Sequence, residues 1–170
     1  MSRLADLFDL TGKRALITGG NSGIGEAMAR ALGLAGAQVT LLARRADQLQ
    51  QSCERLQAEH IDCDTLALDL SDTAAIKAAC AQLLNAHGTI DILVNAAGVN
   101  LREPFEQVDE AAWQTHLALH LSAPFFLTQQ LAPAMQRSAG VASSIWPRCS
   151  RTALLTTVLR MGPAKAASCS

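Results

Sequence analysis

The sequence predicts an α/β fold, in which a Rossmann-like, doubly wound parallel sheet carries helices on both faces. Short apolar runs with Ile, Leu or Val at their centres are the predicted strands: 14–18, 38–43, 63–69 and 90–95. Stretches of helical length lie between them. Strands that alternate with helices favour a parallel sheet that is covered on both sides.

Three of the predicted helices follow from apolar residues at helical spacing. They cover 23–35 through Ile24, Met28, Ala31, Leu32 and Ala35; 46–58 through Leu49, Cys53 and Leu56; and 72–87 through Ile76, Ala79, Cys80, Leu83 and Leu84. Ser71 is expected to cap the last of them. Gly36 and Gly88 lie where helix C-caps belong.

A fourth helical pattern runs from about 109 to 135, and Pro124 and Pro133 are expected to interrupt it. The composition changes at about Gly140. All 15 acidic residues lie at or before Glu110, while the last thirty residues contain four basic residues and no acid. We therefore divide the chain into two parts, 1–140 and 141–170.

Length and composition exclude several classes of protein. A chain of 170 residues with 49% hydrophobic residues suits one globular domain with a real core. Its formal net charge of −1 gives no reason to expect nucleic acid or a membrane surface as partner, and no run reaches membrane-spanning length. Acids interrupt the N-terminal segment where a signal peptide needs an apolar stretch, so a cytoplasmic location is expected.

The five cysteines and four histidines do not predict a metal site. No cysteine pair has C-x-x-C spacing, and Cys53 and Cys80 fall on apolar helix faces, where we expect them to be small buried hydrophobes. His116 and His120 are four residues apart and could face one metal. No Cys, Asp or Glu completes that set, so no metal is predicted.

The segment Thr18-Gly-Gly-Asn-Ser-Gly-Ile-Gly25 follows the first predicted strand and opens the first predicted helix. Its glycines allow the backbone to come close to a ligand, and the first turn of a helix points free N–H groups at negative charge. We therefore expect this loop to bind a diphosphate. Leu68-Asp69-Leu70 and Val94-Asn-Ala-Ala-Gly98 end the third and fourth strands, which is where open parallel sheets bind ligands.

Together these motifs resemble the N-terminal part of the short-chain dehydrogenase/reductase family over about residues 8–140. The run from Ser122 to Met135 is also typical of the long helix of that family. The resemblance implies an NAD(P)-dependent oxidoreductase that transfers hydride between the cofactor and a small alcohol or ketone, in a family that forms homo-oligomers. It also implies the residues that bind the cofactor: Gly19, Asn21, Ser22, Gly23, Ile24 and Gly25 at the diphosphate, Asp69 with Leu70 at the adenine, and Asn95, Ala96 and Gly98 at the nicotinamide ribose.

Arg44 and Arg45 bear on the choice between NADP and NAD. Enzymes that prefer NAD usually place an acid just after the second strand to bind the ribose 2′-hydroxyl, and this chain has no acid there before Asp47. A guanidinium at Arg44 suits a 2′-phosphate instead. NADP(H) is therefore the expected cofactor and NAD the alternative; Ser22, where many NADP-preferring relatives carry a base, counts against NADP.

The resemblance also implies a catalytic set that this chain lacks in part. In the family a tyrosine transfers the hydroxyl proton, a lysine four residues later favours the phenolate, and a serine holds the substrate oxygen. The chain contains no tyrosine: Met161-Gly-Pro-Ala-Lys165 lies where Tyr-x-x-x-Lys belongs, and Arg148 lies where the serine belongs. Lys165 is the retained catalytic residue, and His120 aligns with a family asparagine that helps to relay protons.

We predict that 141–170 is an aberrant tail, read one base out of frame, which replaces the fifth strand and the start of the catalytic helix. A shift of one base allows Ile-Ile-Asn-Leu-Ala-Ser over 143–148 and Tyr-Gly-Ala-Ser-Lys over 161–165. The family fold runs to about 250 residues, so we expect a truncated chain with an incomplete sheet, low solubility and impaired catalysis. Two alternatives remain: a non-catalytic dinucleotide-binding module and an inert fragment of a damaged gene.

Overall fold

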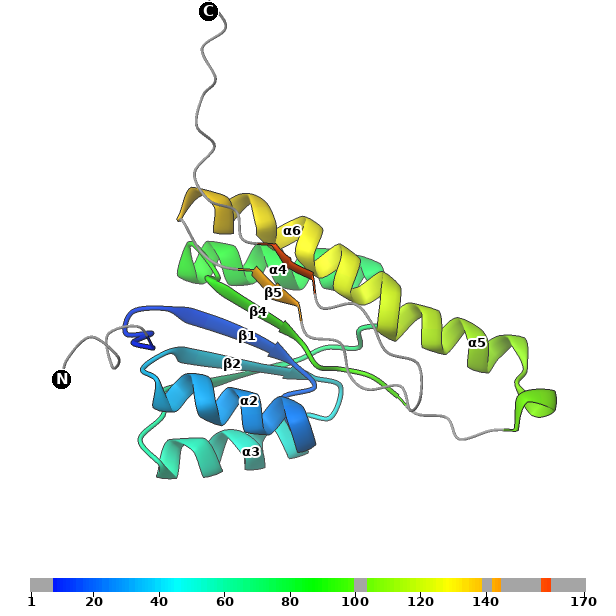
Figure 1. The fold of residues 1–170 in the computed structure, drawn as a ribbon, viewed down its shortest axis with the longest axis horizontal. Helices are drawn as coiled ribbons and strands as arrows, with labels where there is room; N and C mark the ends of the chain where they lie inside the picture. Colours follow the sequence, from blue (N-terminus) through cyan, green and yellow to red (C-terminus); the bar gives the residue numbers. More distant parts are fainter. Residues whose placement is uncertain (1–7, 100–103, 139–141, 145–156, 160–170) are drawn as a thin grey trace, which may run out of the picture.

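The computed structural model describes residues 8–99, 104–138, 142–144 and 157–159. Its centre is a parallel sheet of four strands in the order β3-β2-β1-β4 (Figure 1). The strands are β1 (Arg14–Thr18), β2 (Gln38–Ala43), β3 (Cys63–Ala67) and β4 (Ile92–Asn95). The chain runs outward through β2 and β3 and then returns to place β4 on the other side of β1. The α/β fold class predicted from the sequence is confirmed.

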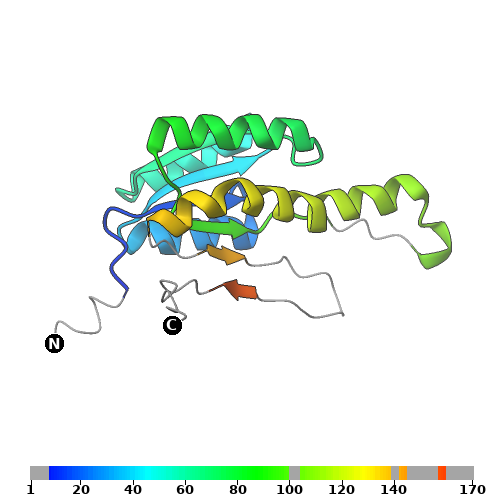
Figure 2. The ribbon, with the colours of Figure 1, turned by 90° about the horizontal axis from the view of Figure 1, so that it is seen from above.

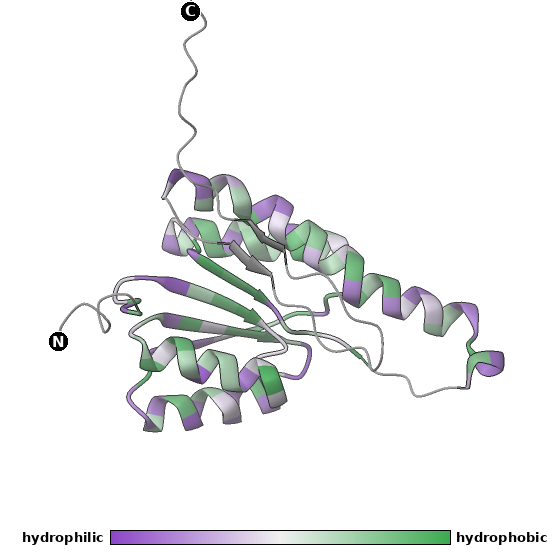
Figure 3. Ribbon diagram, viewed as in Figure 1, coloured by the Kyte–Doolittle hydropathy of each residue, from purple (hydrophilic) through white to green (hydrophobic). Residues whose placement is uncertain are grey.

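Helices cover both faces of the sheet. α2 (Gly23–Leu34) and α3 (Ala46–Ala58) lie on one face, and α4 (Thr73–His87) and α6 (Ala123–Arg137) lie on the other (Figure 1). The two-residue period of β1 supplies both cores: Ala15 and Ile17 pack under α2 and α3, while Leu16 packs under α4 and α6. Figure 3 shows hydrophobic residues along the strands and hydrophilic residues on the outer sides of the helices.

Two strands are shorter than predicted, because β3 ends at Ala67 rather than at 69 and β4 begins at Ile92 rather than at 90. The ends of α2, α3 and α4 lie within one residue of prediction, and one cap differs. Gly36 (φ 97°) and Gly88 (φ 77°) have the positive φ that favours glycine at helix ends. The N-cap of α4 is Asp72, because its carboxylate accepts bonds from N–H groups of the first turn. The prediction of Ser71 as the cap was therefore wrong, and Ser71 bonds Asp69 instead.

One long helical run joins α5 to α6. It follows the short 3₁₀ turn η1 (Phe105–Gln107) and consists of α5 (Glu110–Leu117), the π-helical turn η2 (Ala118–Ser122) and α6. Pro124 has no N–H to donate and is the second residue of α6, directly after η2 and Ala123, which explains the break in α-helical bonding there. The predicted interruption at Pro133 was wrong, because Pro133 lies on the exposed side of α6, where the carbonyl that it leaves unbonded can reach solvent.

β5 (Ala142–Ser144) and β6 (Thr157–Leu159) form a separate antiparallel pair. Figure 2 shows the two strands running in opposite directions, with β5 beside β4. The remainder of 141–170 lies outside the described residues. Three interpretations therefore stay predictions: the frame change, the placement of Met161 at the family's tyrosine position, and the role of Lys165.

Cys53, Cys63 and Cys80 are buried as free thiols, which confirms the expectation for Cys53 and Cys80. Cys53 and Cys63 lie in the core under α2 and α3, and Cys80 lies in the core under α4 and α6. In the part of the chain that the structure describes, no helix has the length and apolar character needed to cross a membrane. Within the same residues, no group of three His, Cys, Asp or Glu side chains could hold a metal ion.

Candidate functional site

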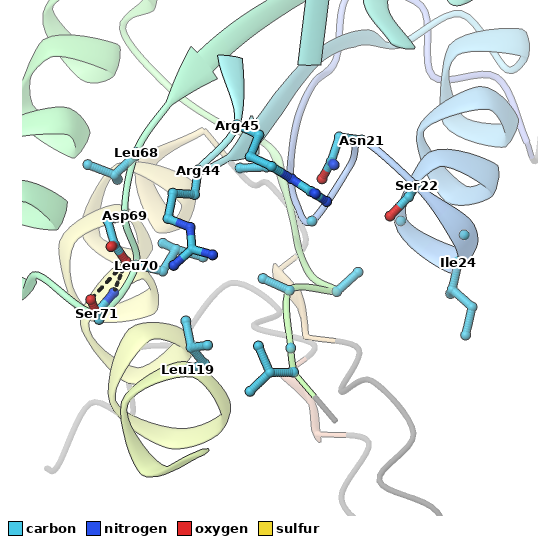
Figure 4. Close-up of a pocket in the computed structure, with 18 of the residues that line it drawn as sticks. Asn21, Ser22, Ile24, Arg44, Arg45, Leu68, Asp69, Leu70, Ser71 and Leu119 are labelled. Atoms are coloured by element: carbon cyan, nitrogen blue, oxygen red, sulfur yellow. Dashed lines mark hydrogen bonds between the residues drawn. The ribbon is translucent and has the colours of Figure 1, made fainter. Parts of the chain in front are cut away.

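A pocket of about 700 Å³ lies at the carboxyl ends of the parallel strands (Figure 4). Its wall comes from four segments at strand ends: residues between 19 and 25 after β1, 43–45 at the end of β2, 68–71 after β3 and 96–99 after β4. Thr115 of α5 and Leu119 of η2 complete the lining. The strand order switches between β1 and β4, which is the position where open α/β sheets bind ligands.

Glycine is required in the 19–25 loop for two different reasons. A Cβ on Gly19 would lie 2.8 Å from the Cα of Ala97, and a Cβ on Gly25 would overlap the carbonyl group of Gly19. At Gly23 the φ of 55° favours glycine, but a Cβ there would meet no atom within 4 Å. Gly19 and Gly25 thus allow the loop to pack tightly, whereas Gly23 borders open space in the pocket.

The N-terminus of α2 faces this pocket. Ser22 is the N-cap in an extended conformation (φ −168°, ψ 161°), and its side chain makes no capping bond. The first N–H groups of a helix lack partners within the helix, and the helix dipole favours negative charge beside them. Gly19 is not such a donor, because its N–H bonds the carbonyl of Leu42 at 2.7 Å.

All but one of the predicted cofactor-binding residues line the pocket: Gly19, Asn21, Ser22, Gly23, Ile24, Gly25, Arg44, Asp69, Leu70, Ala96 and Gly98. Asn95 lies behind the lining at the end of β4 and is 2% exposed. Ile24, one of the apolar residues whose spacing predicted the helix, lies at the pocket rather than in the core. It is 57% exposed, because Gly25 and Ala29 are the residues of α2 buried against the sheet.

Sequence reasoning missed Thr18, which holds the turn after β4. Its hydroxyl accepts N–H bonds from Ala96 and Ala97, both at 3.0 Å, and lies 3.4 Å from the carbonyl oxygen of Val94. The Thr18 residue is 1% exposed. The hydroxyl replaces the ladder bonds that β4 loses where it leaves the sheet. A hydroxyl residue at the end of a strand, directly before a glycine loop, is the signal that could have found it.

Asp69 and Arg44 occupy one end of the pocket. The Asp69 carboxylate accepts bonds from the Ser71 N–H at 2.9 Å and from the Ser71 hydroxyl at 2.8 Å. These bonds, together with the nearby charge of Arg44, hold the pKa of Asp69 below its ordinary value. Figure 4 shows the Arg44 side chain extending towards the Asp69–Leu70 segment. A positive group and a fixed carboxylate therefore share this end.

Asp69→Asn is expected to reduce the loss in the free energy of unfolding as the pH falls below about 4. Because folding lowers the pKa of Asp69, the ionised carboxylate stabilises the fold above its unfolded pKa of about 4, and this contribution is lost as the pH falls through the lower folded value. Solvent screening keeps the effect below about 1 kcal/mol. Urea unfolding across this pH range measures it, and equal losses in variant and wild type would contradict the prediction.

His120 contacts the 96–99 segment from outside the pocket lining. Its Nε2 lies 3.0 Å from the carbonyl oxygen of Val99 and 3.4 Å from the Val99 nitrogen. The ring of His116 stacks on it at 5.7 Å between centroids. His120 therefore supports Val99, which lines the pocket. Its catalytic role stays a prediction.

Comparison with protein families gives a match that includes every residue lining the pocket. A family model described as short chain dehydrogenase matches residues 13–146. The chain belongs to the short chain dehydrogenase family. The matched residues include β1–β4, the glycine-rich loop and the long helical run from α5 to α6. The chain spans about half the length of the curated family members that it matches.

Two of these family members act on related sugar acids by name. Gluconate 5-dehydrogenase of Gluconobacter oxydans (strain 621H) is 36% identical over 127 residues, which cover 75% of this chain and 50% of the relative. The 5-keto-D-gluconate 5-reductase of Escherichia coli (strain K12) is 35% identical over 136 residues, which cover 79% and 54%.

Two solved structures of the family are similar in fold and contain cofactor. A metagenomic short-chain oxidoreductase in complex with NADP has 39% identity and a TM-score of 0.73, over 77% of this chain and 60% of that one. L-Sorbose reductase from Gluconobacter frateurii, complexed with NADPH and L-sorbose, has 29% identity and a TM-score of 0.75, over 81% and 53%.

Proposed function

We propose that the pocket binds NADP(H), with the diphosphate at the start of α2. The observation that carries this proposal is the open space at Gly23, beside a helix N-terminus and within a pocket lined from all four strand ends. A side chain at Gly23 would fill that space. The residues present fit the cofactor, because backbone N–H groups at the start of α2 suit an anion that approaches the backbone closely.

The remaining lining residues suit the rest of the cofactor. Asp69 and Leu70 would border the adenine, and the 96–98 segment would border the nicotinamide ribose. Arg44 would bind the 2′-phosphate, since a guanidinium recognises phosphate through charge-assisted bonds. The similar solved structures, which are complexes with NADP or NADPH, support NADP(H) over NAD(H).

Arg44→Ala is expected to weaken NADPH binding by about tenfold to a hundredfold and to leave NADH binding nearly unchanged. The reason is that only NADPH carries the 2′-phosphate, and a hydrogen bond to a charged group contributes about 1.5–3 kcal/mol. Fluorescence titration with both cofactors measures the change. Arg30→Ala is the matched control, because Arg30 pairs with Glu59 on the surface and does not line the pocket. An equal loss for both cofactors would contradict the assignment.

We further propose that the parent activity is hydride transfer between NADP(H) and a small alcohol or ketone. The nicotinamide ring supplies the hydride chemistry when the cofactor is bound. The 96–98 segment and its support from Thr18 would orient the nicotinamide side, and Arg44 would hold the adenine side. The names of the relatives, which act on gluconate, 5-keto-D-gluconate and L-sorbose, support small hydroxylated substrates.

This chain is proposed to bind the cofactor without catalysing turnover. It contains no tyrosine, and Met161, at the position implied for that tyrosine, has no ionisable proton. Lys165 alone can favour a phenolate but cannot replace it as the group that transfers the substrate proton. The chain would therefore act as the non-catalytic binding module.

An NADPH titration followed by an NADPH oxidation assay with small keto acids and keto sugars tests both proposals. We expect saturable NADPH binding and no turnover above background. Turnover would contradict the loss of catalysis, and the absence of binding would favour an inert fragment. Sequencing of the gene around codons 138–170 tests the frame change, which fails if a shift of one base yields no serine and tyrosine codons at 148 and 161.

A further inference from the structure

We infer that Ser52 on α3 is a positioning residue for the glycine-rich loop, with Gln48 as its partner. Ser52 is fully buried at 0% exposure, and its hydroxyl donates to the backbone carbonyl of Asn21 at 3.1 Å. One helical turn earlier, the side-chain carbonyl of Gln48 accepts a bond from the Asn21 side-chain amide at 2.9 Å. Thus α3 holds both the backbone and the side chain of Asn21.

Arg55 in turn holds the Ser52 hydroxyl. Its guanidinium donates to the Ser52 Oγ at 2.8 Å and to the Oε1 of Glu26 through two nitrogens, at 2.7 and 2.9 Å. Glu26 lies in the first turn of α2. A cation that donates to a hydroxyl polarises it and strengthens the bond that the hydroxyl donates onward. The connection therefore runs from α2 through Arg55 and Ser52 to the loop that precedes α2.

This connection sets the orientation of one peptide group in the loop. The carbonyl of Asn21 and the N–H of Ser22 belong to the same planar trans peptide, so they point in opposite directions. Because α3 holds the carbonyl, the Ser22 N–H is turned away from α3. Asn21 and Ser22 line the pocket, whereas Ser52 does not. Ser52 therefore orients a potential ligand donor without touching the ligand.

The start of the same helix also positions the two arginines at the other end of the pocket. Arg45 is the N-cap of α3, and Arg44 directly precedes it. Consequently α3 fixes the spacing between the arginines and the glycine-rich loop. The effect of this spacing on NADP(H) affinity rests on the proposed function; the effect on the loop itself does not.

Native-state hydrogen exchange of the ligand-free chain tests the structural part. Ser52→Ala is expected to speed exchange at the amides of Gly19 and Glu26, which bond the carbonyls of Leu42 and Ser22 at the two ends of the loop. The expected increase is about tenfold relative to the amide of Leu16, which reports on the central strand. Cys53→Ala is the matched control. Cys53 is the next residue on α3, is similarly small and buried at 3% exposure, and bonds the carbonyl of Cys63 rather than the loop. Equal loop exchange in the two variants would overturn the inference, whether or not the chain binds NADPH.

Binding measurements test the consequence for the cofactor. Ser52→Ala should raise the Kd for NADPH about tenfold and leave the Kd for 2′-AMP nearly unchanged, because 2′-AMP has a 2′-phosphate but no diphosphate. Cys53→Ala should change neither Kd. Equal weakening of both ligands by Ser52→Ala would indicate general damage and overturn the positioning role. Failure of the wild type to bind NADPH would instead reject the proposed function.

Gln48→Ala provides a second variant in case Ser52→Ala does not fold. Gln48 is half-buried, and its bond to Asn21 joins the same two segments. The exchange and binding effects should have the same direction as those of Ser52→Ala and a smaller size. Unchanged loop exchange in Gln48→Ala, with Ser52→Ala unfolded, would overturn the inference.

Discussion

Gly25→Ala is expected to lower the free energy of unfolding by about 3 kcal/mol or more, which is enough to unfold much of a marginally stable domain. The added methyl would overlap the carbonyl group of Gly19 and would lie 3.2 Å from the Gly20 nitrogen. Both neighbours are backbone, so they can move aside only if α2 shifts away from β1. Thermal and urea unfolding, followed by circular dichroism, measure the loss.

Gly23→Ala is the matched control for this prediction. Its methyl would meet no atom within 4 Å, and only the φ of 55° would be strained, at a cost of about 1 kcal/mol. The fold should therefore survive, while NADPH binding should fall at least about tenfold, because the methyl enters the space proposed for the diphosphate. Equal stability of the two variants would contradict the packing argument.

Thr18→Val is expected to destabilise the chain by about 2–4 kcal/mol and to disorder the turn after β4. Valine has nearly the same shape as threonine, so the change removes the hydroxyl and little packing. The N–H groups of Ala96 and Ala97 would then lose their acceptor in a part-buried position, at about 1–3 kcal/mol for each unsatisfied group. Urea unfolding and hydrogen exchange at these two amides measure the effect.

Two further variants separate the hydroxyl from the methyl group. Thr18→Ser keeps the hydroxyl and should retain most of the bonding to the turn. Thr40→Val makes the same chemical change on the neighbouring strand β2, at a half-buried position opposite Leu16, and should cost much less. If Thr18→Val and Thr40→Val cost the same, the hydroxyl of Thr18 has no special role.

The elements with local signals could be predicted from the sequence. α3 has the predicted bounds of 46–58, because Leu49, Cys53 and Leu56 form one apolar stripe. The pocket lining was largely predictable for a similar reason, since the ends of parallel strands meet at one edge of the sheet. Neither inference needs knowledge of contacts distant along the chain.

Features that depend on distant contacts could not be predicted. The packing of α2 is one such feature: its close approach to the sheet occurs at Gly25 and Ala29, which leaves Ile24 exposed beside the pocket. Thr115 and Leu119 line the pocket because the packing of α6 against α4 carries α5 and η2 past the strand ends. The sequence shows that these two residues are four apart and share a helix face, but it does not show that this face borders the pocket.

The buried cysteines allow the core on each face of the sheet to be followed by thiol labelling. Burial raises the pKa of the Cys53 and Cys63 thiols, and it raises the pKa of Cys80 to about 11, so in the folded chain near neutral pH all three should resist alkylation. Labelling of Cys53 and Cys63 would time the opening of one side of the sheet, and labelling of Cys80 would time the other. The two halves of the core can thus be followed separately in one sample, without any engineered probe.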